Sequence, residues 1–220
     1  MNNIVMAFLI SLFAGLSTLF GCFFLVVKPK NVCRFIGISL AFSATIMVLI
    51  SVLELIPNGF YFIYHHNSLL LAIFMLILMF FIGYLLNSYL NKKIAEKGFN
   101  SDNLYRVGIL SMIALIIHNI PEGIAIAVPI YYSTRSRGKA VINTLISGLS
   151  EVIGALIAYL FLYKYLSNFL ISIILLFVAG IMISISINDI FDEARKYSKK
   201  DILIGVLLGI VMIVITQFII

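Results

Sequence analysis

Residues 68–90, SLLLAIFMLILMFFIGYLLNSYL, contain no Asp, Glu, Lys or Arg. A helix of about 20 mainly apolar residues is long enough to cross the hydrocarbon core of a bilayer. We therefore expect this stretch to form a membrane-spanning helix. The same criterion, applied outward along the chain, predicts seven such helices, near residues 4–27, 32–56, 68–90, 105–132, 140–163, 168–190 and 201–219.

The composition also indicates a membrane protein. Of the 220 residues, 63% are hydrophobic and 11% are charged, whereas charged residues make up about 25% of a typical soluble domain. We therefore predict an all-α fold, a polytopic transmembrane helix bundle of about seven helices that forms one domain over residues 1–220. The lipid bilayer is then a partner. Nucleic acid is not, because the net charge of +6 is gathered in short loops and not along one basic stripe.

The basic loops give conflicting information on orientation. Loops 28–34 and 92–106 are basic and loop 57–67 has no Lys or Arg, so the first two are expected in the cytoplasm. Loop 135–139 is basic as well and is therefore also expected in the cytoplasm. Residues 107–131 lie between two of these loops and are long enough to cross once, not twice. Three explanations remain open. One half of the chain is inserted against its charge preference, residues 107–131 form a re-entrant segment, or the protein exists in both orientations.

A motif near the middle of the chain carries metal-ligand chemistry. His118 and Glu122 are four residues apart in LIIHNIPEG, which places them on one helical face, with Asn119 beside them. Imidazole, carboxamide and carboxylate groups suit zinc, iron(II), manganese or cobalt as a transported ion, and no cofactor is indicated. Pro121 is expected to open the helix beside these ligands. The structural alternative is that His118 bonds an internal carbonyl and a neutral Glu122 bridges two helices.

A further acidic residue, Glu151, lies in the next predicted helix. Ser147 and Gly154 share its face, and small residues allow another helix to approach closely. The carboxylate is therefore directed into the bundle, where it can meet the motif. The alternative is a packing seam with a protonated Glu. Gly205 and Gly209 form a similar small pair in the last helix.

Glu54 ends the second predicted helix, near the side without basic loops. It is a candidate for attracting cations at an entrance, and a solvated helix-end carboxylate is an equal alternative. His65 and His66 are expected in the adjacent loop, where they either help to gather metal or are merely exposed.

An acidic cluster lies at the inner end of the sixth predicted helix. It comprises Asn188, Asp189, Asp192 and Glu193. Asp189 is a candidate for receiving ions on exit, whereas the alternative is a solvated cap that faces Arg195 and Lys196. The chain has no phosphate-binding loop and no nucleophile with an adjacent base, so we expect neither an ATP-driven pump nor an enzyme.

The segments HNIPEG at residues 118–123 and SGLSE at residues 147–151 resemble the ZIP family of zinc and iron transporters, most closely its bacterial ZupT-type branch. The resemblance implies an eight-helix protein of the cell membrane that carries zinc, and often iron(II) or manganese, into the cytoplasm. It implies that His118, Asn119 and Glu122 are metal ligands from one helix and that Glu151 is the ligand from the helix that follows. It also implies that the chain forms a homodimer.

The chain departs from the family pattern in one respect. The family has two successive motif-bearing helices, whereas this sequence has one, as if a helix and its loop were missing between residues 105–117 and 124–140. Three interpretations remain. A dimer partner supplies the second motif helix, the chain binds one metal ion through its own residues, or it is a degenerate or partner-dependent relative without transport of its own. Our working prediction is divalent-metal transport.

Overall fold

The computed structural model describes residues 12, 15–16, 18–26, 29–96, 119–157, 160 and 167–219. Within these ranges all regular structure is helical, as predicted. In chain order the elements are the 3₁₀ helix η1 (Thr18–Leu25), α2 (Val32–Ile50), the π-helical turn η2 (Ser51–Leu55), α3 (Ile56–His66), α4 (Leu69–Glu96), α6 (Asn119–Thr134), α7 (Arg137–Ile157), α8 (Asn168–Ile185), the π-helical turn η4 (Ser186–Phe191), α9 (Asp192–Ala194) and α10 (Lys199–Ile219).

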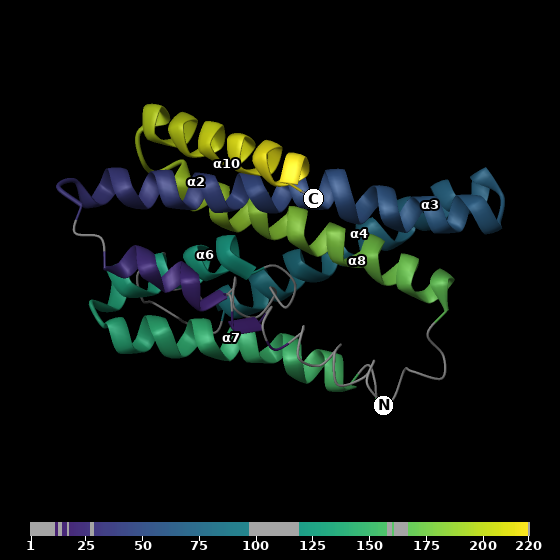
Figure 1. Cartoon of the computed structure of the whole chain (residues 1–220), viewed down its shortest axis with the longest axis horizontal. Helices are drawn as coiled ribbons and strands as arrows, with labels where there is room; N and C mark the ends of the chain where they lie inside the picture. Colours follow the sequence, from purple (N-terminus) through teal and green to yellow (C-terminus); the bar gives the residue numbers. More distant parts are fainter. Residues whose placement is uncertain are drawn as a thin grey trace.

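The helices run along the long axis of the molecule and form two layers (Figure 1). One layer contains α2, α3, α4, α8 and α10, in which α2 packs against α10 and α4 against α8. The other contains η1, α6 and α7, in which η1 packs against both helices. Contacts between α2 and α6 join the layers, so the motif helix lies where the two layers meet.

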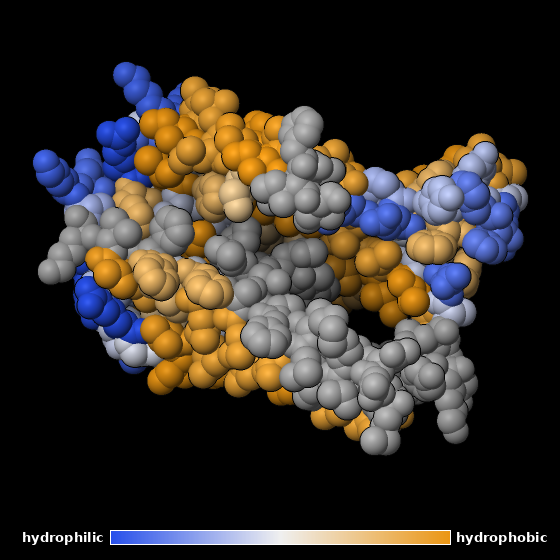
Figure 2. Space-filling view, viewed as in Figure 1, coloured by the Kyte–Doolittle hydropathy of each residue, from blue (hydrophilic) through white to orange (hydrophobic). Residues whose placement is uncertain are grey.

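The outer surface is suited to lipid. Figure 2 shows an apolar middle with hydrophilic residues gathered at the ends of the long axis. Among the described residues, three helical segments are long and apolar enough to cross a membrane: Val32–His66, Leu69–Leu90 and Asn168–Ala194. Only 11% of the most apolar window of Leu69–Leu90 is buried, so α4 exposes most of its apolar surface. This confirms a helical membrane bundle.

Small residues set the closest helix contacts, as the sequence predicted for α10. Gly205 packs against the backbone of α2 at Ile38 and Phe42, and a Cβ at Gly209 would lie 2.9 Å from Cβ of Thr45. Across the neighbouring pair, Gly83 of α4 lies against the backbone of α8. Without a hydrophobic driving force between helices in lipid, such close packing is a main source of association.

The structure corrects the predicted loop at residues 57–67, because the chain stays helical from α2 through α3 to His66. Pro57 follows directly after the π-helical turn η2, and the helix continues through it. His65 and His66 form the last turn of α3, with Nδ1 atoms 3.1 and 3.0 Å from the carbonyl oxygens of Tyr61 and Phe62. Both histidines are exposed.

The two π-helical turns occur at corresponding positions of a repeated sequence pattern. Residues 44–55, ATIMVLISVLEL, and residues 179–190, AGIMISISINDI, share Ala, Ile, Met, Ile and Ser in register, and Glu54 corresponds to Asp189. In each copy the Ser opens the π turn. Ser51 donates a hydrogen bond to the carbonyl of Met47 at 2.8 Å, and the Ser186 hydroxyl donates equivalently at 2.7 Å. The two copies run in opposite directions, which is the arrangement of an inverted repeat.

The basic loops of both halves lie at the same end of the molecule. Arg34 Nε is 3.2 Å from Asp201 Oδ1. The ring centroids of Phe35 and Tyr132 are 6.2 Å apart, and the Arg135 guanidinium lies 5.9 Å from the Tyr132 ring centroid. We call this end, with residues 30–34, 135–139 and 195–201, the basic end. The basic loops that each half would keep in the cytoplasm therefore lie at one end of the bundle.

The last turns of α4 and the end of α6 both lie at the basic end. Asn87 of α4 bonds Asp189 near that end, so the last turns of α4 point toward it. Thr134, at the end of α6, lies there as well. Residues 97–118, which connect the two helices, lie outside the described residues, so the alternatives for residues 107–131 stay predictions.

Cysteine labelling of the reconstituted chain is expected to show this topology. With Cys22→Ser as background, we expect the exposed Cys33 to react from one side of the membrane. Gly138→Cys, made with Cys33→Ser, should react from the same side, and Asn67→Cys from the other. A membrane-impermeant maleimide added before or after permeabilisation measures the side. Reaction of Cys33 and Gly138→Cys from opposite sides would contradict the shared basic end.

Candidate metal site

The predicted motif forms the start of α6. Asn119 is the first residue of this helix and Glu122 lies in its first turn. His118 lies outside the described residues, and the side chains of Asn119, Glu122 and Glu151 lie outside them as well, so these three are placed by backbone only. Pro121 lies within α6, and the predicted opening beside it involves the carbonyl of Ile117, which lies outside the described residues.

Glu122 and Glu151 lie far from the basic end along their helices. At 1.5 Å per residue, the Glu122 backbone is about 18 Å from Thr134 at the basic end. In α7, which packs against α6, the Glu151 backbone is about 21 Å from Arg137 at the same end. The two carboxylate-bearing positions are therefore at nearly the same depth on neighbouring helices.

Glycines bring three elements together around these positions. A Cβ on Gly123, next to Glu122, would clash with the carbonyl oxygen of Thr18 in η1. A Cβ on Gly148, one turn before Glu151, would clash with the carbonyl oxygen of Gly15. Only glycine permits this approach, so η1 lies wedged between α6 and α7 at the depth of the motif.

The acidic cluster at the end of α8 contains exposed and buried members. Asp192 is exposed and pairs with Arg195 at 2.7 Å, as the solvated-cap alternative predicted. Glu193 is only 6% exposed and pairs with Lys196 at 2.6 Å, and Asp189 is only 5% exposed. The solvated cap therefore accounts for Asp192, whereas Asp189 and Glu193 are buried.

Asp189 belongs to a polar network between α4 and η4. The amide of Asn87, itself 3% exposed, donates to Asp189 Oδ2 at 3.3 Å and to the Ser184 hydroxyl at 3.1 Å. Asn188 donates to the Tyr84 hydroxyl at 2.9 Å and to the Ser184 hydroxyl at 3.2 Å. Buried polar groups in a bilayer need such partners, and their presence within a span is itself a sign of function.

Glu54 lies in η2 and its side chain is exposed. About 20 residues of helix separate it from Arg34 at the basic end, or roughly 30 Å, whereas Asp189 lies close to the basic end. The structure therefore places the two residues at different depths along the bundle.

Sequence reasoning missed three residues. Asn87 and Tyr84 bind the η4 side chains from α4, and a polar Asn inside the uncharged stretch 68–90 was the available signal. Ser43 Oγ is buried and has no hydrogen-bond partner among the described residues. Counted along α2 from the contact of Phe35 with Tyr132, Ser43 lies about 12 Å deep, close to the depth of Glu122. No sequence pattern distinguished this serine from its neighbours.

The described side chains do not by themselves form a metal centre. Within the part of the chain that the structure describes, no three His, Cys, Asp or Glu residues lie close enough to hold a metal ion. A site at the motif therefore depends on Asn119, Glu122 and Glu151, whose backbones α6 and α7 bring to one depth, and on His118.

A family model described as ZIP Zinc transporter matches residues 98–217, more than half of the chain. The chain belongs to the ZIP family. Its members are transporters, which confirms the expectation that this protein is not an enzyme. The matched region contains α6, α7, α8 and most of α10, and so includes every predicted metal ligand.

Curated relatives extend the similarity over almost the whole chain. A protein named zinc transporter ZupT from Clostridium perfringens (strain 13 / Type A) is 29% identical over 274 aligned residues, which cover 98% of this chain and 96% of the relative. The protein of the same name from Chlorobium chlorochromatii (strain CaD3) is 30% identical over 267 residues, with 98% and 97% covered. These matches confirm the resemblance to the ZupT-type branch.

The alignments also bear on the missing helix. The alignment with the Clostridium perfringens protein is 274 residues long and exceeds the 220 residues of this chain by 54. That relative therefore has at least as many residues that face gaps in this ZIP protein. A deficit of this size is sufficient for a membrane-spanning helix with its loop, or for two, and it supports the interpretation that this chain is shorter than the family pattern.

Proposed function

We propose that this ZIP protein carries zinc across a cell membrane into the cytoplasm, with iron(II), manganese and cobalt as further substrates. The observation that supports the proposal most directly is the matched depth of the Glu122 and Glu151 backbones on the packed helices α6 and α7. A pair of carboxylates inside a bilayer is costly unless a cation binds between them.

The proposed ligands are His118, Asn119 and Glu122 of the motif together with Glu151. Neutral imidazole and carboxylate oxygens are ordinary ligands of zinc and of the neighbouring divalent ions. Because positive loops favour the cytoplasm, the basic end is the inner end. Zinc then enters from the end where Glu54 lies exposed and leaves near Asp189, and the inverted repeat gives these two residues equivalent positions in the two copies.

The chain is proposed to act as a homodimer in the cell membrane. A second copy offers one source for the motif helix that the family pattern contains and this chain lacks. The test of function is uptake of labelled zinc into liposomes that contain the purified chain. Zinc accumulation above that of empty liposomes supports transport. Uptake equal to that of empty liposomes, for a chain that is folded and inserted, overturns it.

The shortfall of residues relative to the Clostridium perfringens protein favours a second candidate, a partner-dependent subunit. In that case the chain contributes Glu122 and Glu151 to a site completed by a full-length ZIP protein. Liposomes containing both proteins should then take up zinc faster than the sum of the separate preparations. Equal rates would exclude this candidate.

Replacing Asp189 with Asn is expected to slow zinc uptake by about tenfold. Hydrogen bonds to a charged group contribute about 1.5–3 kcal/mol, and about 1.4 kcal/mol corresponds to a factor of ten in rate. Asp192→Asn is the matched control, because Asp192 is exposed and pairs with Arg195 on the surface. We expect it to change the rate less than about twofold. Equal effects of the two substitutions would contradict a role of Asp189 in the exit path.

A further inference from the structure

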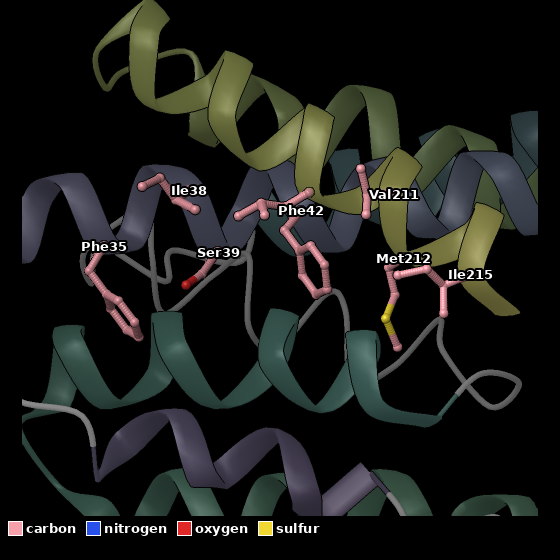
Figure 3. A pocket seen from close by; sticks show the side chains of 8 residues that line it. Phe35, Ile38, Ser39, Phe42, Val211, Met212 and Ile215 are labelled. Atoms are coloured by element: carbon pink, nitrogen blue, oxygen red, sulfur yellow. The ribbon is translucent and has the colours of Figure 1, made fainter.

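A groove of about 320 Å³ lies along α2 and α10. Four residues of α2, from Phe35 to Phe42, and four residues of α10, from Leu208 to Ile215, line it. Figure 3 shows Phe35, Phe42 and Met212 pointing into the same space. Ser39 provides the one polar side chain of the lining. A buried water needs two to four polar partners, so this groove favours an apolar occupant.

The groove extends inward from the basic end. Phe35 follows Arg34, which pairs with Asp201 at 3.2 Å. Along α10, Leu208 lies about 10 Å from Asp201 and Ile215 about 21 Å. Half of the hydrocarbon core of a bilayer is about 15 Å thick. The groove therefore extends over about one leaflet, which is the reach of one acyl chain whose headgroup lies at the basic end.

The mouth of the groove is positively charged. Lys30, Arg34, Lys199 and Lys200 are exposed there, and Asp201 is the acidic residue that pairs with Arg34. The N-termini of α2 and α10 also lie at this mouth and add partial positive charge. Basic pockets between membrane helices on the cytoplasmic side suit anionic lipid headgroups.

We propose that the groove binds one anionic phospholipid from the leaflet at the basic end. One acyl chain lies against Phe35, Phe42 and Met212, and the phosphate lies beside Arg34 and the first turn of α10. The charge at the mouth selects an anionic headgroup, and the apolar lining holds the chain. This site is separate from the proposed path of zinc, and its test does not depend on transport.

The experiment is native mass spectrometry of the full chain, released from nanodiscs that contain equal amounts of dioleoylphosphatidylglycerol and dioleoylphosphatidylcholine. We expect one phosphatidylglycerol molecule to be retained per chain. The variant Lys199→Gln with Lys200→Gln keeps the Arg34–Asp201 pair and should weaken retention by about 30-fold, since each basic residue near an anionic lipid contributes about a fivefold effect.

The matched charge control is Arg137→Gln with Lys139→Gln, which removes the same charge from the basic end at α7, away from the groove. It should retain the lipid. A similar loss in both double variants would indicate general attraction to the surface and would overturn the proposal. Equal retention of the two lipids by the unaltered chain would overturn it as well.

A second pair of variants tests the groove itself. Ser39→Phe fills the groove and should abolish lipid retention, whereas Leu207→Phe, on the exposed side of α10, should not. If Ser39→Phe lowers the melting temperature, Ser39→Leu replaces it. Retention unchanged in a folded Ser39 variant would overturn the proposal. So would a disulfide-linked dimer formed by Ser39→Cys in a background of Cys22→Ser and Cys33→Ser, because it would place a second copy in the groove.

Discussion

Replacing Glu122 with alanine is expected to abolish zinc uptake by the reconstituted chain, with a loss of about 100-fold or more. The substitution removes a proposed ligand, and even the loss of a group that only supports a ligand typically costs 10–100-fold in metal affinity. Glu122 lies in the first turn of α6, about 18 Å from the basic end. At that depth water cannot replace the missing carboxylate.

Glu122→Gln tests whether charge is the essential property. The amide keeps the size and one oxygen acceptor of the side chain but removes the negative charge, so uptake should be lost nearly as fully as in Glu122→Ala. Asp192→Asn is the control, because its side chain is exposed and pairs with Arg195 on the surface. It should keep at least about half of the uptake, because screening by solvent makes exposed charges weak.

The measurement is the initial rate of zinc entry at several zinc concentrations. If Glu122 binds the transported ion, both the maximal rate and the concentration dependence change. If Glu122 is instead a neutral bridge between helices, Glu122→Gln should preserve uptake, because the amide can make the same bridge. Preserved uptake in that variant would therefore favour the structural alternative.

The fold class, a helical membrane bundle, could be predicted from the sequence for a clear physical reason. Uncharged stretches such as residues 68–90 can be long only where lipid replaces water, and α4 indeed exposes most of that apolar surface. Helix boundaries were harder to predict. Pro57 was read as the start of a loop, yet the helix continues through it from the π-helical turn η2 to His66.

The orientation could not be derived from loop charges because the basic loops of both halves were expected in the cytoplasm. The structure places these loops at one end of the bundle through contacts between segments far apart in the sequence, such as Arg34 with Asp201 and Phe35 with Tyr132. Charge counting treats each loop alone, whereas these contacts arise from packing of the two layers. Tertiary contacts of this kind have no local sequence signal.

The metal ligands of the candidate site stay predictions. The four-residue spacing of the motif and the small face around Glu151 pointed to α6 and α7, and the structure shows that these two helices are neighbours. The polar network around Asp189 was not foreseen, because Asn87 and Ser184 become partners only when α4 packs against α8. The repeated pattern that relates Glu54 to Asp189 is present in the sequence, whereas the paired π turns are seen only in the structure.

Replacing Gly123 with valine is expected to destabilise the protein by about 3 kcal/mol or more. Overpacking usually costs about 1–3 kcal/mol, and here the obstacle is backbone. The new Cβ would clash with the carbonyl oxygen of Thr18 in η1, and the same glycine lies against Gly21. Rotamer changes cannot relieve such a clash, so η1 must move away from α6.

The measurement is thermal unfolding in detergent followed by loss of helical signal, for which we expect a decrease of about 10 °C in melting temperature. Gly138→Ala is the control, because a Cβ there would meet only the Ser136 hydroxyl, at 3.9 Å, and should change stability by less than about 0.5 kcal/mol. Gly148→Val, which clashes with Gly15 on the other side of η1, should resemble Gly123→Val. Because both glycines hold η1 against the helices that carry Glu122 and Glu151, separation of η1 should also reduce zinc uptake in these variants. Equal melting temperatures for Gly123→Val and Gly138→Ala would contradict the wedged position of η1 and remove the support it gives to the site.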